Sequence, residues 1–407
     1  MSEPAYQAAH AAARDAYGRL IATLCRRGHD VAQAEDALAT AFERALTRWP
    51  TDGVPDVPAA WLLTTARRVL IDQARHRGVE HDTAVALLPL VEGVSTKEAT
   101  TDRRLALMVL CAHPDIHPNA RAPLMLQTVL GLNARQMSTA FVVSPAALGQ
   151  RLARAKRAIR DRAIPFELTG TEALSERLGD VLDAIYASFS TGWDDATGAR
   201  DERHGLAGEA LWLGHIVCTQ APREPEALGL LALMLFSQAR VDARRDNERY
   251  VPLSEQDRDR WQWSRIEQAE RCLARAATLN DIGRFQLEAA IQSHHVRTPA
   301  GEAPNWEAIA LLYEGLHRLA PTLAVSVGRA AALGAARGPA AGLAALAVLP
   351  RNAVKSFQPY FAVKAHLHAA AGQTDRALDD YRRAQGLSDD PAVRQFLVRK
   401  QRQLNSS

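Results

Sequence analysis

The chain has 407 residues, of which 47% are hydrophobic and 23% charged, a composition typical of a soluble protein with two or three domains of roughly 100 to 200 residues each. Its formal charge of +3 is unevenly distributed, because residues 1–165 hold 21 Lys and Arg against 16 Asp and Glu, whereas residues 166–407 hold 28 against 30. A strongly acidic or strongly basic protein is thereby excluded, and any polyanion partner is expected to bind the N-terminal part.

Cysteine spacing and hydropathy exclude further classes. Cys25, Cys111, Cys218 and Cys272 have no CxxC spacing, which argues against a zinc ribbon or a disulfide framework and favours a reducing compartment. The longest apolar run, Ala227–Phe236, is half of the roughly 20 residues needed to span a bilayer, and no signal segment begins the chain. We therefore expect a cytoplasmic protein that does not enter a membrane.

Helical periodicity dominates the chain, and no alternating apolar run is long enough to predict a sheet, so the expected fold class is all-α. Residues 14–49 predict two helices separated at Arg26–Asp30. The Pro- and Gly-containing stretch 50–58 is expected to end the second helix, and another helix follows up to Gly78. Apolar residues of the second helix share one face, which we expect to be core: Ala34, Leu38, Ala41, Phe42, Ala45, Leu46 and Trp49.

The middle of the chain predicts a linker and then a second helical domain. Residues 81–101 have no sustained pattern and are expected to join a first domain at 1–80 to a second at 102–165. Helices resume at Asp102, break at residues 113–120, and continue through residues 133–143 into a basic helix.

The basic helix is the stretch 144–162, which carries six Lys or Arg residues against one Asp. Ser144 is expected to accept a hydrogen bond from the first free backbone amides, and Pro145 fits the first helical position. At about 100° per residue, four apolar residues form one narrow stripe that packs, namely Leu148, Leu152, Ala155 and Ile159.

Residues 166–407 are expected to form a third part, an extension of short Ala- and Leu-rich helices. Gly338 and Gly372 are 34 residues apart, which is the tetratricopeptide spacing, and the helices before them align. The first-helix Leu-Gly of that repeat is absent, so the match is partial. Small and bulky residues are expected to pack between paired helices there: Phe361, Ala365, Ala377, Tyr381 and Ala384.

Two helices joined by a short turn, the second of them basic, suit a recognition helix in the DNA major groove. In this interpretation residues early in the helix approach base edges, namely Pro145, Ala146, Gly149 and Gln150. The basic residues neutralise phosphates, namely Arg151, Arg154, Lys156, Arg157 and Arg160. The alternative is a solvated basic face without a nucleic-acid role.

Together with the helices at 34–49 and 59–78, this arrangement resembles bacterial RNA polymerase sigma factors of the extracytoplasmic-function (ECF) type. Residues 14–77 are similar to their region 2 and residues 102–163 to their region 4. Stretches of the remaining chain, such as "LALMLFSQARVDARRD", resemble the subgroup with a C-terminal tetratricopeptide-like extension.

The resemblance implies partners and sites. The partners are core RNA polymerase, through its β′ clamp helices and β flap, and promoter DNA, through its −10 and −35 elements; a regulatory protein is expected at the extension. The helix from Pro145 reads the −35 element. Residues expected to bind polymerase are Glu35, Asp36, Ala39, Thr40, Glu43 and Arg44, and those expected at the −10 element are Trp61, Arg67, Arg68, Arg75 and Arg77.

Two departures from the family pattern bear on these expectations. Relatives carry Gln-Glu where this chain has Ala39-Thr40, which removes polar contacts expected toward the clamp helices. Val142 stands at the turn where many such units have Gly, and a β-branched residue resists positive φ.

No catalytic or cofactor site is indicated. The chain has no Gly-rich phosphate loop or nucleophile elbow, and Cys111, His113 and His117 lack a convincing fourth metal ligand, so turn capping and packing are expected of them. Two other interpretations stay open: a stand-alone helix-turn-helix regulator, and a repeat scaffold whose sigma part has degenerated.

Overall fold

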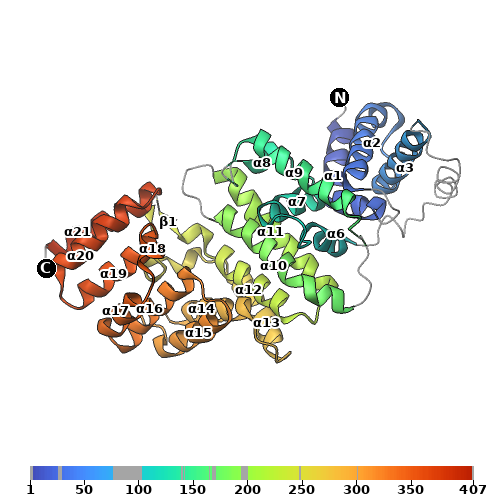
Figure 1. Ribbon diagram of the computed structural model, residues 1–407. Coiled ribbons are helices and arrows are strands. Elements are labelled where there is room, and N and C mark those ends of the chain that lie inside the picture. Colours follow the sequence, from blue (N-terminus) through green and yellow to red (C-terminus); the bar gives the residue numbers. More distant parts are fainter. Residues whose placement is uncertain are drawn as a thin grey trace. The chain divides into compact units, whose positions relative to one another are not determined.

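The computed structural model describes residues 3–25, 30–76, 103–138, 141, 143–164, 166, 171–193, 200–246, 249–299 and 301–405. It divides into two compact units, residues 1–193 with 202–210, and residues 194–201 with 211–407. Helices dominate both units (Figure 1), which confirms the all-α fold class.

The first unit contains eight helices within the described residues, besides the part of α11 (Arg200–Gln220) that belongs to it. They are α1 (Glu3–Cys25), α2 (Val31–Asp52), α3 (Pro58–His76), α6 (Arg104–Cys111), α7 (Pro118–Leu130), α8 (Ala134–Ser138), α9 (Pro145–Asp161) and α10 (Thr171–Trp193). The helix break near residue 30 is confirmed, since Asp30 caps α2 by accepting a 2.8 Å hydrogen bond from the amide of Gln33. The predicted linker and the stop at Gly78 lie outside the described residues.

The end of α2 differs from the sequence expectation. Pro50 lies inside the last turn, and α2 continues to Asp52, where Gly53 caps it at φ +87°. Pro50 is tolerated because it lies close to the C-terminal end of α2, which ends at Asp52. Gly53 then caps the helix in a backbone conformation that residues with a Cβ rarely adopt.

Helix α1 is the central element of the first unit. It packs against α2 and α3 on the one hand and against α6 and α7 on the other, as Figure 1 shows for the blue and teal helices. The expected core face of α2 is confirmed for Ala34, Leu38, Ala41, Ala45 and Trp49, which are at most 3% exposed, whereas its other two members are half-buried.

The first unit also extends past residue 165, where sequence analysis places the start of the extension. Helix α10 packs on α6 and α7, and Asp180 forms a 2.6 Å ion pair with Arg121 of α7. The first compact unit therefore ends later in the chain than the expected domain boundary at residue 165, because α10 buries its apolar face on α6 and α7.

The second unit is a succession of short helices that pack on their neighbours in sequence. After α11 come α12 (Pro225–Gln238), α13 (Trp263–Ala277), α14 (Arg284–Arg297), α15 (Trp306–Leu319), α16 (Leu323–Arg337), α17 (Pro339–Ala347), α18 (Arg351–Val354), α19 (Gln358–Ala370), α20 (Thr374–Gly386) and α21 (Pro391–Asn405). Between α12 and α13, β1 (Arg245–Asp246) and β2 (Arg249–Tyr250) form an antiparallel two-stranded ribbon that sequence analysis does not predict. Three 3₁₀ helices flank it, η2 (Val241–Ala243), η3 (Leu253–Glu255) and η4 (Arg258–Arg260).

The 34-residue spacing corresponds to two similar helix pairs. Gly338 follows α16 and Gly372 follows α19, both at positive φ, and in each case the next helix packs back on the preceding one. Of the predicted packing residues, Phe361, Ala365, Tyr381 and Ala384 form one cluster with Leu397, and Ala377 is fully buried outside that cluster. Among the described helices, none is both long and apolar enough to cross a membrane.

Candidate nucleic-acid interface

Helix α9 begins as the sequence predicts. The Ser144 hydroxyl accepts a 3.2 Å hydrogen bond from the amide of Ala147, and Pro145 occupies the first helical position, where no N–H is needed. All four residues of the apolar stripe, Leu148, Leu152, Ala155 and Ile159, are at most 5% exposed. The orientation of α9 is therefore set by its core face, which packs on α7 and α8.

The face of α9 opposite this stripe is exposed. At about 100° per residue, Gln150, Ala153, Arg157 and Arg160 project away from the core, and each is exposed, as is Ala146 in the first turn. Pro145 is exposed and Gly149 half-buried. Among these residues, Arg157 has no ion pair or hydrogen bond to any other described side chain, while Arg160 contacts Asp161 at 3.1 Å. The outward face thus presents small residues, one amide and two arginines.

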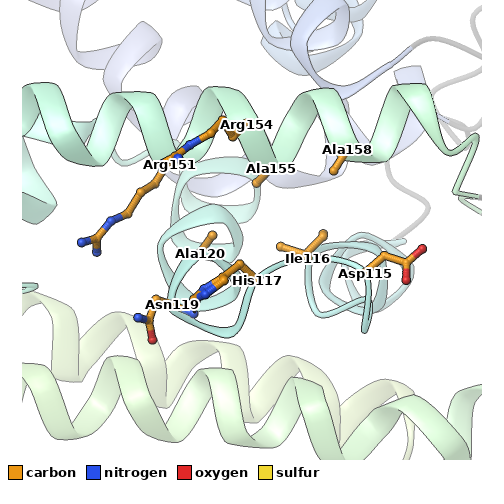
Figure 2. Close-up of a pocket in the computed structure, with 9 residues that line it drawn as sticks. All are labelled: Asp115, Ile116, His117, Asn119, Ala120, Arg151, Arg154, Ala155 and Ala158. Atoms are coloured by element: carbon orange, nitrogen blue, oxygen red, sulfur yellow. Dashed lines mark hydrogen bonds between the residues drawn. The ribbon is translucent and has the colours of Figure 1, made fainter.

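Arg151 and Arg154 lie on one flank of α9, beside a pocket of about 400 Å³. Figure 2 shows both arginines on α9 at one side of the pocket, with Ala155 and Ala158 further along the same helix, facing the turn that begins α7. The turn contributes Asp115, Ile116, His117, Asn119 and Ala120. Arg154 is exposed and Arg151 half-buried, and within the described part of the chain neither forms an ion pair.

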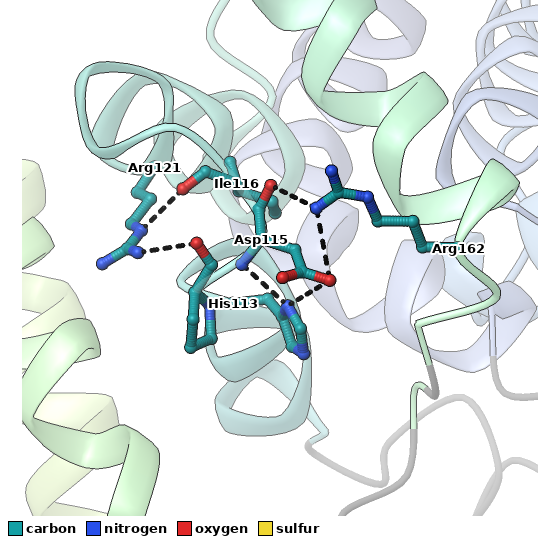
Figure 3. A network of polar contacts seen from close by, with 6 residues as sticks. His113, Asp115, Ile116, Arg121 and Arg162 are labelled. Carbon is teal, nitrogen blue, oxygen red and sulfur yellow. Dashed lines mark hydrogen bonds and ion pairs between the residues drawn. The ribbon is translucent and has the colours of Figure 1, made fainter.

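The turn before α7 is held by two arginines that sequence analysis does not single out (Figure 3). Arg162 contacts the Asp115 carboxylate at 3.2 Å and donates to the Asp115 carbonyl at 3.1 Å. Arg121 donates to the carbonyls of Ile116 and Pro114 at 3.0 and 3.2 Å. Since Asp115 is neutralised by Arg162, the pocket beside α9 keeps a net positive character.

Lys156 lies on the other flank of α9 and pairs with a carboxylate of α2. Its ammonium donates to the carboxylate of Glu35 on α2, and the two side chains are only 14% and 12% exposed. Burial raises the pKa of Glu35, although the nearby ammonium of Lys156 opposes that shift. In this structure the two charges, expected at a DNA and a polymerase contact respectively, therefore pair with each other.

The other expected polymerase-binding residues of α2 stay accessible. Asp36, Ala39, Glu43 and Arg44 are exposed, and Thr40 is half-buried with its hydroxyl donating to the Asp36 carbonyl at 3.0 Å. They form an outward face of mixed charge opposite the buried stripe of α2.

On α3 the structure divides the expected −10 residues. Trp61 is half-buried and stacks edge-on against Trp49, with ring centroids 5.5 Å apart. Arg68 and Arg75 are exposed, whereas Arg67, at 5% exposed, lies at a position of α3 that faces the core. Arg77 lies outside the described residues, as does Val142 at the turn before α9.

The three residues considered as metal ligands have structural roles instead. The Cys111 thiol lies 3.0 Å from the Thr128 hydroxyl in the core, and His113 and His117 accept backbone N–H bonds at the turn, with His117 capping α7. This confirms the expectation of turn capping and packing. No cluster of three or more metal-ligating side chains occurs within the part of the chain described.

Comparisons with known proteins bear on this arrangement. Residues 13–79 match the family model "Sigma-70 region 2", and residues 177–277 match "Family of unknown function (DUF6596)". An uncharacterized protein of Rhizobium meliloti (strain 1021) is 36% identical over 322 residues, which is 76% of each chain. No solved structure matches.

Proposed function

We propose, from the match of residues 13–79 to the sigma-70 region 2 family, that this chain is an ECF-type sigma factor that binds core RNA polymerase and directs promoter recognition and opening. It has no catalytic role in this proposal and works in the cytoplasm, where the polymerase acts. No cofactor or metal is required.

The observation that carries the proposal is the outward face of α9. An α-helix fits the major groove, and residues early in a recognition helix reach base edges while basic residues further along contact phosphates. Gln150 and Ala146 occupy the early exposed positions, and Arg157 and Arg160 the later ones. We assign base recognition at a −35 element to the early residues and phosphate contact to Arg154, Arg157 and Arg160, with Arg151 at the edge of this surface.

The polymerase contact is assigned to the exposed face of α2. Asp36, Glu43 and Arg44 lie on that face, away from the buried stripe, and a rim of charge favours fast and specific association. Trp61, Arg68 and Arg75 on α3 are assigned to the −10 element, where a basic surface with an aromatic side chain can hold unpaired bases.

The second unit is proposed to be a tetratricopeptide-like extension that regulates initiation through protein contacts. Most of its helices bury their apolar faces against helices close to them in sequence, as in repeat arrays, whose surfaces commonly bind other proteins, and α21 also packs its Phe396 on Tyr250 of β2. A stand-alone DNA-binding regulator and a repeat scaffold without promoter activity are the alternatives that an experiment must separate.

Co-elution of the full chain with purified core RNA polymerase tests the proposal. The double charge reversal Asp36→Lys with Glu43→Lys is expected to reduce co-elution at least about tenfold. The matched control reverses Asp375 and Asp379, two exposed carboxylates of α20, and is expected to leave co-elution unchanged. If the wild-type chain binds duplex DNA but never co-elutes with polymerase, the stand-alone regulator is correct and the proposal is wrong.

A further inference from the structure

The pocket between α9 and the turn that begins α7 lies wholly within the first unit and has a volume of about 400 Å³ (Figure 2). Sites for small molecules measure roughly 300 to 1,000 Å³ and are lined mainly by apolar groups with a few polar ones. The buried part of this lining is apolar, namely Ile116, Ala120 and Ala155, and Ala158 is half-buried. The pocket therefore offers room and apolar surface for the uncharged part of a small ligand.

Two guanidinium groups line the pocket without a partner among the described residues. Arg151 is half-buried and Arg154 exposed, and in the described ranges neither side chain forms an ion pair or a hydrogen bond. They are three residues apart on α9 and so are neighbours on the helix surface. A guanidinium binds phosphate through two parallel N–H···O hydrogen bonds, so two neighbouring ones suit a single doubly charged phosphate.

The acidic residue of the pocket lining does not compensate these two charges. Asp115 is the one carboxylate among the lining residues, and Arg162 already contacts it at 3.2 Å. Burial lowers the pKa of His113 in the same turn, and nearby guanidiniums, of which Arg177 contributes most, lower it further against the opposing charge of Asp115. The turn thus lies in a positive environment, which favours an anionic ligand.

The N-terminal end of α7 adds hydrogen-bond donors to the same pocket. His117 caps the helix by accepting the Asn119 backbone N–H at Nδ1, so its neutral ring carries the proton on Nε2 and can donate from there. The side-chain amide of Asn119 is exposed and also lines the pocket. Both residues stand at the positive end of the helix dipole, which favours an anion as well.

We propose that this pocket binds a small phosphate monoester, with its phosphate between Arg151, Arg154 and the start of α7 and its uncharged body over Ala155 and Ala158. A phosphate of the DNA backbone shares this chemistry, but it is a diester with a single negative charge and no body to cover the apolar lining. At about 100° per residue, Arg151 also projects well away from Gln150 on the outward face of α9. These features favour a free monoester.

A bound ester is expected to compete with DNA. Arg154 is one of the residues of α9 proposed to contact promoter phosphates, and it cannot hold both anions at once. The ester therefore lowers DNA affinity by the same factor by which DNA lowers ester affinity. This competition rests on the proposed function, whereas ester binding itself does not.

Isothermal titration calorimetry of the full chain tests the site. The probes are adenosine monophosphate, ribose 5-phosphate and glycerol 3-phosphate, compared with inorganic phosphate and with adenosine. At least one ester is expected to bind about tenfold or more tightly than inorganic phosphate, because its body covers apolar surface, and adenosine is expected not to bind. The proposal is wrong if no ester binds more tightly than inorganic phosphate, or if adenosine binds as tightly as its monophosphate.

Charge variants locate the bound ester. Arg151→Gln with Arg154→Gln should lower its affinity at least about tenfold. The matched control, Arg157→Gln with Arg160→Gln, removes the same charge from the outward face of α9 and should change the affinity less than about twofold at ~0.15 M salt, where distant charges are screened. Equal losses in the two double variants would show attraction to net charge alone and would overturn the site.

A pocket-filling variant tests the position of the ester's body. Ala158→Leu adds apolar volume beside the two arginines and leaves every charge in place. It should lower the affinity for the ester to nearly that for inorganic phosphate, without changing the affinity for inorganic phosphate. Circular dichroism verifies that each variant keeps its helices, and an ester affinity that the leucine does not change would contradict the proposal.

Fluorescence anisotropy of a labelled DNA duplex separates the two sources of phosphate. At constant ionic strength, the bound ester should weaken duplex binding by the wild type about fivefold or more, and it should have no effect on the Arg151→Gln, Arg154→Gln variant. If duplex binding requires both arginines but no ester binds, a DNA phosphate occupies the pocket and the proposal is wrong. If the ester binds as expected but the chain never co-elutes with core polymerase, the site is correct and the proposed function fails.

Discussion

Helices α9 and α20 are both amphipathic and rich in arginine, yet they use their charges differently. On α20, Arg382 pairs with Asp379 at 2.6 Å, Arg376 donates to Gln373 at 3.2 Å, and Arg383 lies 4.3 Å from the centre of the Phe361 ring. On α9, Arg151, Arg154 and Arg157 have no such partner among the described residues.

An abundance of arginine on a helix is therefore not sufficient to identify a binding surface. The arginines of α20 contribute to the structure of their own unit, whereas those of α9 are left for an external anion. Substitutions on α9 and α20 separate these two uses of charge, and the expected effects decrease from DNA affinity to the stability of buried and capping groups.

The largest effect is expected from replacing Arg151, Arg154 and Arg157 together by Gln. At about 1.5 kcal/mol per charged contact, the affinity for promoter duplex should fall on the order of 1,000-fold, and the log–log salt dependence should flatten by about three units. Fluorescence anisotropy titrations at several salt concentrations measure both quantities.

The matching variant of α20 replaces Arg376, Arg382 and Arg383 by Gln. It is expected to leave DNA affinity unchanged and to lower the stability of the second unit by about 1 kcal/mol, chiefly through loss of the Arg383–Phe361 contact. Equal losses of DNA affinity in the two triple variants would show that net charge, and not the α9 surface, drives binding.

The second prediction concerns acid stability of the second unit. Burial, with the nearby Arg240 guanidinium, lowers the pKa of His295 from its usual 6.5 to about 4. Between pH 6.5 and 4 the unfolded chain therefore binds a proton that the folded chain does not, so stability falls as the pH falls, by up to about 3 kcal/mol.

Urea unfolding followed by the fluorescence of Trp306, whose ring stacks edge-on with His295 at 5.5 Å, measures this loss. His295→Gln should remove most of the pH dependence in that window. If His295→Gln loses as much stability as the wild type between pH 6.5 and 4, the pH dependence comes from another titratable group.

The third prediction separates a buried carboxylate of α20 from an exposed one. Asp380 is 8% exposed and contacts the Lys364 ammonium at 3.2 Å and His368 at 3.5 Å. Asp380→Ala should destabilise the second unit by about 2 kcal/mol, because it leaves Lys364 without its partner. The neighbouring Asp379→Ala should cost less than about 0.5 kcal/mol, since that carboxylate is exposed. Chemical denaturation measures the loss of stability in each variant. Similar losses in the two variants would contradict the distinction between the buried and the exposed carboxylate.

The smallest effect is expected at the start of α9. Ser144→Ala removes the side chain that accepts the Ala147 amide and should destabilise the helix by about 1 kcal/mol. Ser144→Asp preserves an acceptor and should retain most of that stability. Thermal unfolding of the first unit, followed by circular dichroism, is the measurement, and equal losses for Ala and Asp would exclude a capping role.

Much of the fold follows from local signals in the sequence. The cap at Ser144, the stripe from Leu148 to Ile159 and the break at Asp30 depend on neighbouring residues along the chain, so periodicity and capping preferences suffice to predict them. The extension of α2 past Pro50 does not follow from the sequence, because proline usually ends a helix. The residue that caps the extended helix is Gly53, which comes after the proline.

The candidate site was predictable only in part. Sequence periodicity distinguishes Arg157 from Leu152, but it does not reveal that Lys156 meets Glu35, since the two lie far apart along the chain. Arg67 is a similar case. Arginine is usually exposed, so its residue type predicts exposure, but its position on the core-facing side of α3 buries it. The small size of Gly18 is a local sign of close packing, yet only the fold identifies Val129 as its neighbour.

Promoter-directed transcription with purified components shows whether the chain acts as a sigma factor. Core RNA polymerase is mixed with a fragmented genomic library, with and without the full chain, and the 5′ ends of the transcripts are sequenced. A sigma factor is expected to give new start sites that share elements near −10 and −35, and these sites are expected to be lost with the triple Gln variant of α9. Start sites that are the same with and without the chain, under conditions where a known sigma factor is active, would contradict the assignment.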